Sequence, residues 1–323
     1  MILQKVAQII ADNIIKKDPI NFYLKFKIRC LSMAKSFLLK FSDPLITAKI
    51  GNFQIALPFS HNLPAYLKKY PYYSTNLARI AEAVNRHFKD FSLIDIGANV
   101  CDSVALLRSK SFFPILCIEG DDYFFSILEK NSKQFNNVSL CKVFLGEKNC
   151  ADFFSLNAIG GTASIQKNEE GRNFKIQILS NVLDDFKKFK RSKMLKIDTD
   201  GFDGFILKGA TQFIKEMKPI IFFEFDPFFL KKQNDNGLAV IMHLKKLGYS
   251  HALVYDNFGE LICGINLEDS LIVESLNNYY TGKNGFSYAD ICAFHKENQE
   301  LYKKVYATEN QFFLKHKNEK KHD

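Results

Sequence analysis

Leu93-Ile94-Asp95-Ile96-Gly97-Ala98-Asn99-Val100-Cys101-Asp102 is the stretch of sequence that decides the fold. It begins with a mainly apolar run suited to a buried strand, Gly97 suits a tight turn, and helical periodicity follows from Ser103. In a doubly wound α/β sheet such a turn opens onto the crevice at the carboxyl ends of the strands, where ligands bind. The stretch therefore predicts one wall of a ligand site.

Downstream of this stretch, short apolar runs alternate with segments of helical periodicity. The predicted strands cover residues 93–96, 115–118, 138–145, 194–197, 220–223, 251–256, 261–265 and 290–294. The predicted helices cover residues 103–108, 124–134, 205–216 and 238–247. This alternation is typical of a doubly wound, mostly parallel sheet. Residues 151–185 interrupt the rhythm and predict a β-rich insertion.

The N-terminal part has a different pattern. Residues 1–41 are predicted to be helical up to the break at Asp43-Pro44, and residues 45–58 form a strand pair with its turn at Gly51-Asn52. Residues 74–88 again have helical spacing, with Ser74 or Thr75 as the N-cap. We therefore predict a helical N-terminal extension over residues 1–89, a main domain over 90–296, and a C-terminal helix with a charged tail over 297–323.

Composition and charge narrow the classes of function. The 323 residues are 47% hydrophobic and carry a formal net charge of +9. Residues 1–50 contain nine Lys or Arg against three acids, which fits a solvated helical face, an anionic membrane surface or an anionic substrate. No run of 18 apolar residues occurs, so we expect no membrane span and no signal peptide. We expect a cytoplasmic protein, with peripheral inner-membrane contact as an alternative.

The seven cysteines give no sign of a metal site. No two of them are closer than nine residues, so no zinc-type spacing exists. An odd number without a secretion signal suggests a reducing compartment.

The turn at Gly97 favours a cofactor without phosphate groups. A dinucleotide site would need further glycines where Asn99 and Asp102 stand, and Asp102 would repel a phosphate. S-adenosylmethionine (SAM) fits better because it carries a sulfonium and an amino group. Glu119 lies 22 residues beyond Gly97 at the end of the next strand, where an acid can accept hydrogen bonds from ribose hydroxyls.

Several carboxylates follow the later strands at the same predicted edge of the sheet. Asp198 and Glu224 end two of these strands, and Asp200 and Asp203 lie on the loop between them. A carboxylate near an acceptor hydroxyl can act as general base; we take Asp198 as first choice, with Glu224 and Asp200 in support. Asp203 also suits a helix N-terminus. A divalent cation is not expected, although Asp198 and Glu224 could hold one. His61 is an alternative base, but a lone histidine is more often structural.

At these residues the sequence resembles FkbM-type class I SAM-dependent methyltransferases over roughly residues 90–295. The resemblance implies the seven-stranded, mostly parallel sheet of that class. The motifs that carry the resemblance are Asp95-Ile96-Gly97-Ala98-Asn99, Lys196-Ile197-Asp198, Asp200-Gly201-Phe202-Asp203, Leu207-Lys208-Gly209-Ala210 and the run from Lys218-Pro219 to Glu224. Residues 72–77 also look like the lead-in helix that such enzymes place over the cofactor. Asp200 stands where the family often has Glu, and Gly120 where Pro is common.

The resemblance implies a SAM-dependent O-methyltransferase that acts on a sugar hydroxyl in bacterial polysaccharide biosynthesis, such as that of capsule or lipopolysaccharide. The predicted SAM-binding residues are Asp95, Gly97, Asn99, Asp102, Glu119, Gly120 and Gly146. The expected partner is a sugar or nucleotide-sugar acceptor, with homo-oligomerisation and membrane contact as further options and no nucleic acid.

Three other functions are alternatives to sugar methylation, and each requires different sequence features. Methylation of adenine amino groups commonly uses an Asp/Asn-Pro-Pro-aromatic loop after the fourth strand, whereas Asp198-Thr199-Asp200-Gly201 stands there. A protein methyltransferase belongs to the same alternative. A non-catalytic module would bind SAM without turnover, and the carboxylates at both strand ends argue against it. A dinucleotide-dependent oxidoreductase lacks the glycines it needs.

Overall fold

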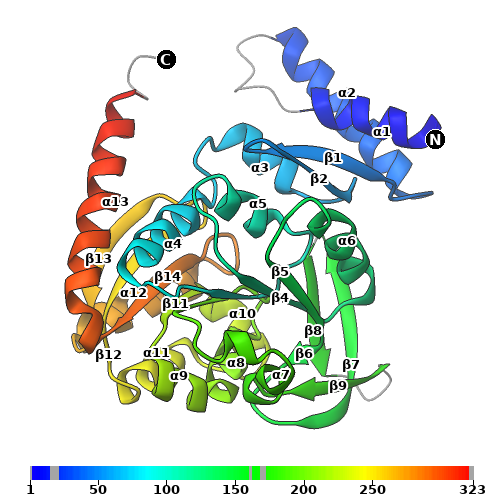
Figure 1. Cartoon of the computed structure of the whole chain (residues 1–323). Coiled ribbons are helices and arrows are strands. Elements are labelled where there is room, and N and C mark those ends of the chain that lie inside the picture. Colours follow the sequence, from blue (N-terminus) through cyan, green and yellow to red (C-terminus); the bar gives the residue numbers. More distant parts are fainter. Residues whose placement is uncertain (1, 15–21, 160–161, 168–171, 320–323) are drawn as a thin grey trace.

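The computed structural model describes residues 2–14, 22–159, 162–167 and 172–319. A central sheet with the strand order β13-β12-β14-β11-β10-β3-β4-β5 organises the chain (Figure 1). Its parallel part comprises β3 (Leu93–Ile96), β4 (Ile115–Glu119), β5 (Val138–Lys142), β10 (Met194–Ile197) and β11 (Ile220–Phe225). The antiparallel strands are β12 (Tyr249–Asp256), β13 (Leu261–Asn266) and β14 (Ala289–His295). The predicted doubly wound class is confirmed, and the edge strand β13 makes eight strands rather than seven.

Helices cover both faces of this sheet because its strands bury both of their sides. Leu93, Ile115 and Met194 contribute to one hydrophobic core, whereas their immediate neighbours contribute to the other. The first core is closed by α4 (Thr75–His87), α5 (Asp102–Arg108), α6 (Asp122–Ser132) and α13 (Gln299–Glu319). The second is closed by α7 (Leu179–Asp185), α8 (Asp203–Gly209), α9 (Thr211–Met217), α10 (Pro227–Lys232), α11 (Gly237–Lys246) and α12 (Ser270–Gly282). Short 3₁₀ turns occur at Lys187–Phe189 and Lys296–Asn298.

The β-rich insertion predicted over residues 151–185 is present. A second sheet has the order β6-β9-β7-β8, built from β6 (Phe144–Leu145), β7 (Cys150–Ile159), β8 (Thr162–Lys167) and β9 (Arg172–Gln177). Gly160 and Gly161 within this insertion lie outside the described residues.

Two predicted elements are interrupted. The strand expected over 138–145 ends at Lys142, because Phe144 and Leu145 leave the central sheet to pair with β9. The helix expected over 205–216 is two helices separated at Ala210. There the hydroxyl of Thr211 donates to the Lys208 carbonyl at 2.5 Å and closes the last turn of α8.

One of the two predicted N-cap residues, Ser74, is at the N-cap position of α4, but the expected capping hydrogen bond is absent. Ser74 occupies the N-cap position with a left-handed backbone (φ 53°) and makes no capping hydrogen bond through its side chain. The Thr75 hydroxyl instead donates to the Tyr72 carbonyl at 2.8 Å and accepts from Arg79.

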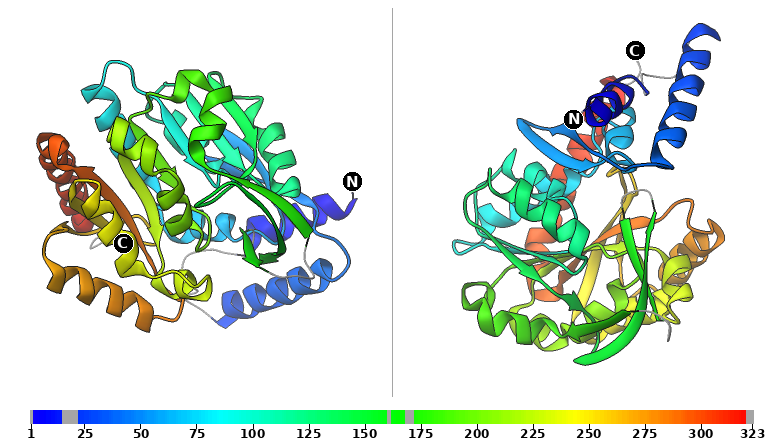
Figure 2. Two further views of the ribbon diagram at one scale, coloured as in Figure 1. Left: turned by 90° about the horizontal axis from the view of Figure 1, so that it is seen from below. Right: turned by 90° about the vertical axis from the view of Figure 1, so that its right-hand side faces the viewer.

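The N-terminal segment packs on the main domain through a strand pair. It comprises α1 (Ile2–Asn13), α2 (Phe22–Leu39), β1 (Leu45–Ile50), β2 (Phe53–Pro58) and α3 (Leu63–Lys69). The buried Asn131 side chain of α6 bonds both the N–H and the carbonyl of Ala56 in β2, at 2.9 and 2.7 Å. The Gln8 side chain bonds the Thr47 backbone in the same way, at 3.0 and 2.8 Å. Helices α1 and α2 thus lie at the outer end of the molecule (Figure 2). The domain division near residue 90 stays a prediction.

Within the described residues, no helix is both long and apolar enough to cross a bilayer.

Candidate functional site

The turn after β3 lies against the turn after β10. Gly97 has a φ of 76°, and a Cβ at this position would lie 1.9 Å from the carbonyl oxygen of Asp198. Only glycine fits this contact. As a result, the loops that follow two neighbouring strands touch, and predicted residues from both line the same cleft.

Glu119 ends β4 beside this turn and keeps part of its hydrogen-bonding capacity. One carboxylate oxygen accepts from the Asn99 N–H at 3.0 Å and the other from the Asp121 N–H at 2.9 Å. Burial raises the pKa of Glu119, and hydrogen bonds from the backbone N–H groups of Asp121, Asn99 and Gly120 oppose that rise. A carboxylate offers about four acceptor positions, so acceptor capacity remains for a ribose hydroxyl. This arrangement fits the nucleoside part of SAM.

A cleft of about 570 Å³ runs along these residues. It is lined, among others, by Gly97, Asn99, Glu119, Gly120, Phe144 and Asp198. A Cβ at Gly120 would lie 2.2 Å from the ring of Phe144, so the glycine makes room for an aromatic wall suited to a flat base. Sequence reasoning did not identify Phe144, because its role depends on contact with Gly120.

Gly146 does not line this cleft, although Leu145 before it does. Gly146 is buried, and a Cβ there would lie 2.8 Å from Ile176. A Cβ at Gly209 would in turn lie 2.0 Å from the Gly146 carbonyl. Close packing between the insertion and α8 therefore accounts for both glycines.

A buried lysine organises the acids at the end of β10. The Lys196 ammonium lies 3.0 Å from Asp95, 3.3 Å from Asp198 and 3.3 Å from the Gly97 carbonyl. Burial alone would lower the pKa of Lys196, but Asp95, Asp198 and Asp102 raise it above its ordinary value. Asp95 is fully buried, so it meets a ligand only through Lys196. The sequence analysis included Lys196 in a motif but assigned it no role. Its position as a charged residue inside an apolar strand was the signal that could have identified it.

An acidic cavity adjoins the cofactor cleft. Its main part has about 730 Å³, and we define it by its five carboxyl groups: Asp102, Asp198, Asp200, Glu224 and Asp290. Gly97, Asn99, Asp198 and Asp200 line both the cleft and this cavity, so the two spaces meet there. The side chain of Asp198 is 51% exposed and lies at that junction.

The carboxyl groups of the cavity differ in their tendency to ionise. Burial and the neighbouring Asp198 and Asp200 raise the pKa of Glu224 well above its usual range. Asp290 faces Glu224 across the β11–β14 pair, and burial raises its pKa strongly as well. Burial also raises the pKa of Asp102 to about 6. Glu224 and Asp290 therefore favour the protonated form, which can donate a hydrogen bond, more than a solvated carboxyl group does, and Asp198 is the carboxyl group open to the junction.

Asp203 serves the loop rather than the cavity. It is buried in the first turn of α8, and its carboxylate accepts from the Thr199 hydroxyl at 3.2 Å and the Gly201 N–H at 3.3 Å. Burial raises its pKa to about 7. This position fits the structural role at a helix N-terminus that the sequence offered for it.

His61 reaches the acidic cavity but is not arranged as a base. Its Nδ1 accepts from the Leu63 N–H at 3.0 Å, so the neutral ring carries its proton on Nε2. Burial lowers the pKa of His61 to about 4, with a side-chain hydrogen bond to Asn99 opposing the shift. His61 is therefore suited to donate a hydrogen bond, not to take a proton.

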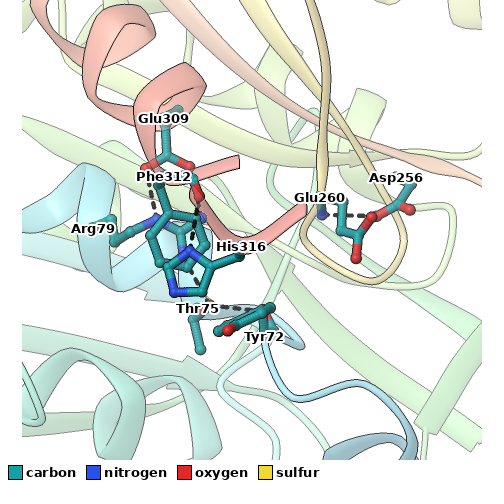
Figure 3. A network of polar contacts seen from close by, with 8 residues as sticks. All are labelled: Tyr72, Thr75, Arg79, Asp256, Glu260, Glu309, Phe312 and His316. Carbon is teal, nitrogen blue, oxygen red and sulfur yellow. Dashed lines mark hydrogen bonds and ion pairs between the residues drawn. The ribbon is translucent and has the colours of Figure 1, made fainter. Parts of the chain in front are cut away.

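Tyrosines complete the cavity. Tyr73 and Tyr288 line both parts of it, and burial raises the pKa of each phenol. Tyr73 belongs to the lead-in segment that the resemblance placed over the cofactor, whereas the adjacent Tyr72 ring packs against Phe312 and His316 instead (Figure 3). Tyr288 was not identified from the sequence, since nothing local marks the residue before β14.

Among the described residues, no group of three or more His, Cys, Asp or Glu side chains is arranged to hold a metal ion. Asp198 and Glu224 line the same cavity, and their use as metal ligands stays an untested alternative.

Comparisons with known proteins bear on this site. Residues 95–250 match the family model described as the methyltransferase FkbM domain. A search of curated proteins finds no match. Among solved structures, methyltransferase FkbM from Methylobacillus flagellatus KT is 17% identical with a TM-score of 0.35, over 50% of this chain and 40% of that one. Precorrin-6y C5,15-methyltransferase from Geobacter metallireducens GS-15 is 13% identical with a TM-score of 0.37, over 68% and 87%. The O-methyltransferase from Bacillus cereus in complex with SAH is 10% identical with a TM-score of 0.36, over 68% and 80%.

These structural likenesses are distant, and the alignment spans less than half of the first of those proteins. The family model supplies the assignment, and it covers the turn at Gly97, the acid at Glu119 and the carboxylates that follow β10 and β11. Residues 95–250 of the chain therefore match the methyltransferase FkbM domain, a class of domain that uses SAM as its methyl donor.

Proposed function

We propose that this protein transfers the methyl group of SAM to a hydroxyl of a sugar whose reacting ring carries no acidic group. The observation that carries the proposal is the position of Asp198, which is half exposed where the cofactor cleft meets the acidic cavity. A base at such a junction can contact an acceptor hydroxyl while the cofactor lies in the adjoining cleft. The sugar, and its use in surface polysaccharides, follow from the resemblance to FkbM-type enzymes.

The cofactor cleft supplies binding and orientation. Glu119 would accept hydrogen bonds from the ribose hydroxyls, and Phe144 would pack against the adenine. Gly97 lets the turn after β3 contact the turn after β10, and Gly120 makes room for the Phe144 ring. SAM, when bound, supplies a methyl group on a positively charged sulfur, which is an electrophile.

Asp198 would then act as the general base. Its carboxylate would take the proton of the acceptor hydroxyl while the acceptor oxygen forms its bond to the methyl carbon and the carbon–sulfur bond breaks. S-adenosylhomocysteine (SAH) and the methyl ether are the products, and the proton remains on Asp198 until water removes it. Lys196 holds Asp198 in position from 3.3 Å away. Protonated Glu224 would donate to a second sugar oxygen.

The charge of the cavity selects among acceptors. Even with Glu224 and Asp290 protonated, three carboxyl groups of the cavity (Asp102, Asp198 and Asp200) can carry negative charge, and the Lys196 ammonium is already paired with Asp95 and Asp198. A neutral sugar can exchange hydrogen bonds with carboxyl and phenol groups, whereas an anionic ring would meet like charges without a spare cation in the described lining. We therefore expect the reacting ring to be neutral or to carry an amino group.

The test is a panel of nucleotide-linked sugars with isotopically labelled SAM. We expect methyl transfer to neutral hexoses or amino sugars, with kcat/KM at least about tenfold lower for the matching uronic acids because like charges meet in the site. Equal transfer to a uronic acid would contradict the acceptor class. Labelling of nucleic acid or protein in place of every sugar would contradict the proposed function.

Replacing Glu119 with alanine is expected to weaken SAH binding by roughly ten- to a hundredfold. The change removes a charged acceptor of ribose hydroxyls, and each such hydrogen bond contributes about 1.5–3 kcal/mol. It also leaves the Asn99 and Asp121 N–H groups without this partner. Calorimetric titration with SAH measures the effect. Asp122→Ala is the matched control, because this nearby acid is exposed and pairs with Lys142 outside the cleft. Unchanged SAH affinity in Glu119→Ala would remove Glu119 from the cofactor site.

A further inference from the structure

The N-terminal helices carry the most uneven surface outside the methyltransferase site. Eight of the nineteen exposed large hydrophobic side chains of the described chain lie before residue 42. Exposed hydrophobic residues are normally scattered singly, and their concentration marks a surface with a partner. Helices α1 and α2 pack against each other at one end of the molecule, so these side chains gather in one region (Figure 2).

Helix α2 presents an apolar stripe to solvent. Its members recur at steps of three or four residues and therefore share one side of the helical path. They are Phe26, Cys30, Met33 and Phe37, continued by Phe41 just after the helix; the large ones are 58%, 66%, 61% and 74% exposed in chain order. The opposite side of α2 packs against the core through Leu31, Ala34 and Leu38. The stripe is thus not what attaches α2 to the protein.

Cations accompany the stripe without any acid. Between Asp18 and Asp43 the sequence contains no Asp or Glu but does contain Lys25, Lys27, Arg29, Lys35 and Lys40. Arg29 and Lys40 are exposed, and helical spacing places both on the same border of the stripe. Such a surface attracts an anionic partner and would repel a second copy of itself.

Helix α1 also exposes apolar side chains along one of its sides. Ile2, Val6 and Ile9 are 79%, 39% and 61% exposed at helical spacing, whereas Ala7 and Ile10 face the core. Helix α1 therefore has an apolar side to spare, as α2 does.

This surface lies next to a wall of the acidic cavity. The Lys68 ammonium of α3 donates to the Ala11 carbonyl of α1 at 2.6 Å. Leu63 and Tyr66 of the same α3 line the cavity. A partner on α1 and α2 would thus lie close to the acceptor side of the site.

We propose that the exposed side of α1 and α2 docks on a bilayer interface that contains anionic lipids. The aromatic and aliphatic side chains enter the boundary between headgroups and acyl chains, and Arg29 and Lys40 contact the lipid phosphates. Charge complementarity selects this partner, since the stripe is bordered by cations alone. The interaction stands independently of the proposed sugar acceptor.

The test is flotation of the full chain with phosphatidylcholine vesicles, with and without phosphatidylglycerol. We expect binding to the anionic vesicles alone, weakened by added salt. Met33→Ser with Phe37→Ser should weaken it by at least about tenfold, because two large apolar side chains no longer enter the interface. Arg29→Gln with Lys40→Gln, which leaves the apolar stripe intact, should weaken it several-fold. Phe286→Ser is the matched control, because Phe286 is 90% exposed and follows Gly285, which lies against Phe228 and Phe229 of α10 rather than against α1 or α2.

Three outcomes would overturn the proposal. The protein does not bind anionic vesicles, it binds neutral vesicles equally well, or both double variants bind like the parent protein. Sedimentation without vesicles identifies the competing case, a homodimer through α2 that Met33→Ser with Phe37→Ser abolishes while vesicles are ignored. SAH affinity of each variant verifies that the methyltransferase domain is folded.

Discussion

Asp198→Asn is expected to lower kcat for methyl transfer by roughly two to four orders of magnitude, the usual contribution of a general base. Asparagine keeps the shape of the side chain and can accept a hydrogen bond from the acceptor hydroxyl, but it cannot take the proton. Binding of SAH should change little, because Glu119 and the cleft walls remain. The measurement is kcat with labelled SAM and a sugar acceptor, together with calorimetric SAH affinity.

The neighbouring acids give this experiment its controls. Glu224→Gln should be milder, because glutamine replaces a protonated carboxyl group as a hydrogen-bond donor. Asp184→Asn should have no effect, since Asp184 pairs with Lys190 on the outside of the protein. If Asp198→Asn kept kcat within about tenfold of the parent protein, general-base catalysis by Asp198 would be excluded. A larger loss in Glu224→Gln than in Asp198→Asn would transfer the role of base to Glu224.

The central sheet could be predicted from sequence because its strands are buried on both faces. Such strands appear as short continuous apolar runs, and the bounds of β3 and β10 agree with the runs at 93–96 and 194–197. Residues 138–145 form a similar run, yet Phe144 and Leu145 belong to another sheet. The apolar pattern indicates that a residue is buried, but it does not indicate which sheet its backbone hydrogen bonds belong to.

The site was predictable where a residue follows its own strand. Gly97, Glu119, Asp198 and Glu224 all come directly at or after strand ends, and parallel strands bring these ends to one edge. Asp290 was not predictable in this way, because it reaches the cavity from an antiparallel strand whose register with Glu224 depends on the tertiary fold. The pairing of Lys196 with Asp95 is likewise a contact between neighbouring strands, set by their register.

A second buried ion pair joins helix α13 to helix α4, which follows the lead-in segment of residues 72–77. Arg79 of α4 donates from Nε and a terminal nitrogen to the two oxygens of Glu309, each at 2.7 Å (Figure 3). The guanidinium also lies 3.6 Å from the ring centroid of Phe312 and donates to the Thr75 hydroxyl at 2.8 Å. The Arg79 and Glu309 side chains are only 10% and 1% exposed. This pair joins α13 to the start of α4, directly after the cavity residue Tyr73.

Arg79→Ala is therefore expected to lower the free energy of unfolding by about 3–5 kcal/mol, because it leaves the Glu309 carboxylate buried without a counter-ion. Denaturant titration followed by circular dichroism measures the loss. Arg86→Ala on the same helix is the matched control: Arg86 is 76% exposed and pairs with Glu82, so its loss should be within about 1 kcal/mol.

A double variant distinguishes two causes of the stability loss, the unpaired buried charge and the lost packing. Arg79→Met with Glu309→Leu should recover most of the stability, since an apolar pair leaves no buried charge behind. If the double variant were as unstable as Arg79→Ala, the stability would come from packing around Phe312 rather than from the ion pair. If Arg79→Ala cost no more than Arg86→Ala, α13 would not hold α4 in place, and Tyr73 would have to be positioned by the β12–β13 turn, where a Cβ at Gly259 would lie 3.0 Å from the Ser74 nitrogen.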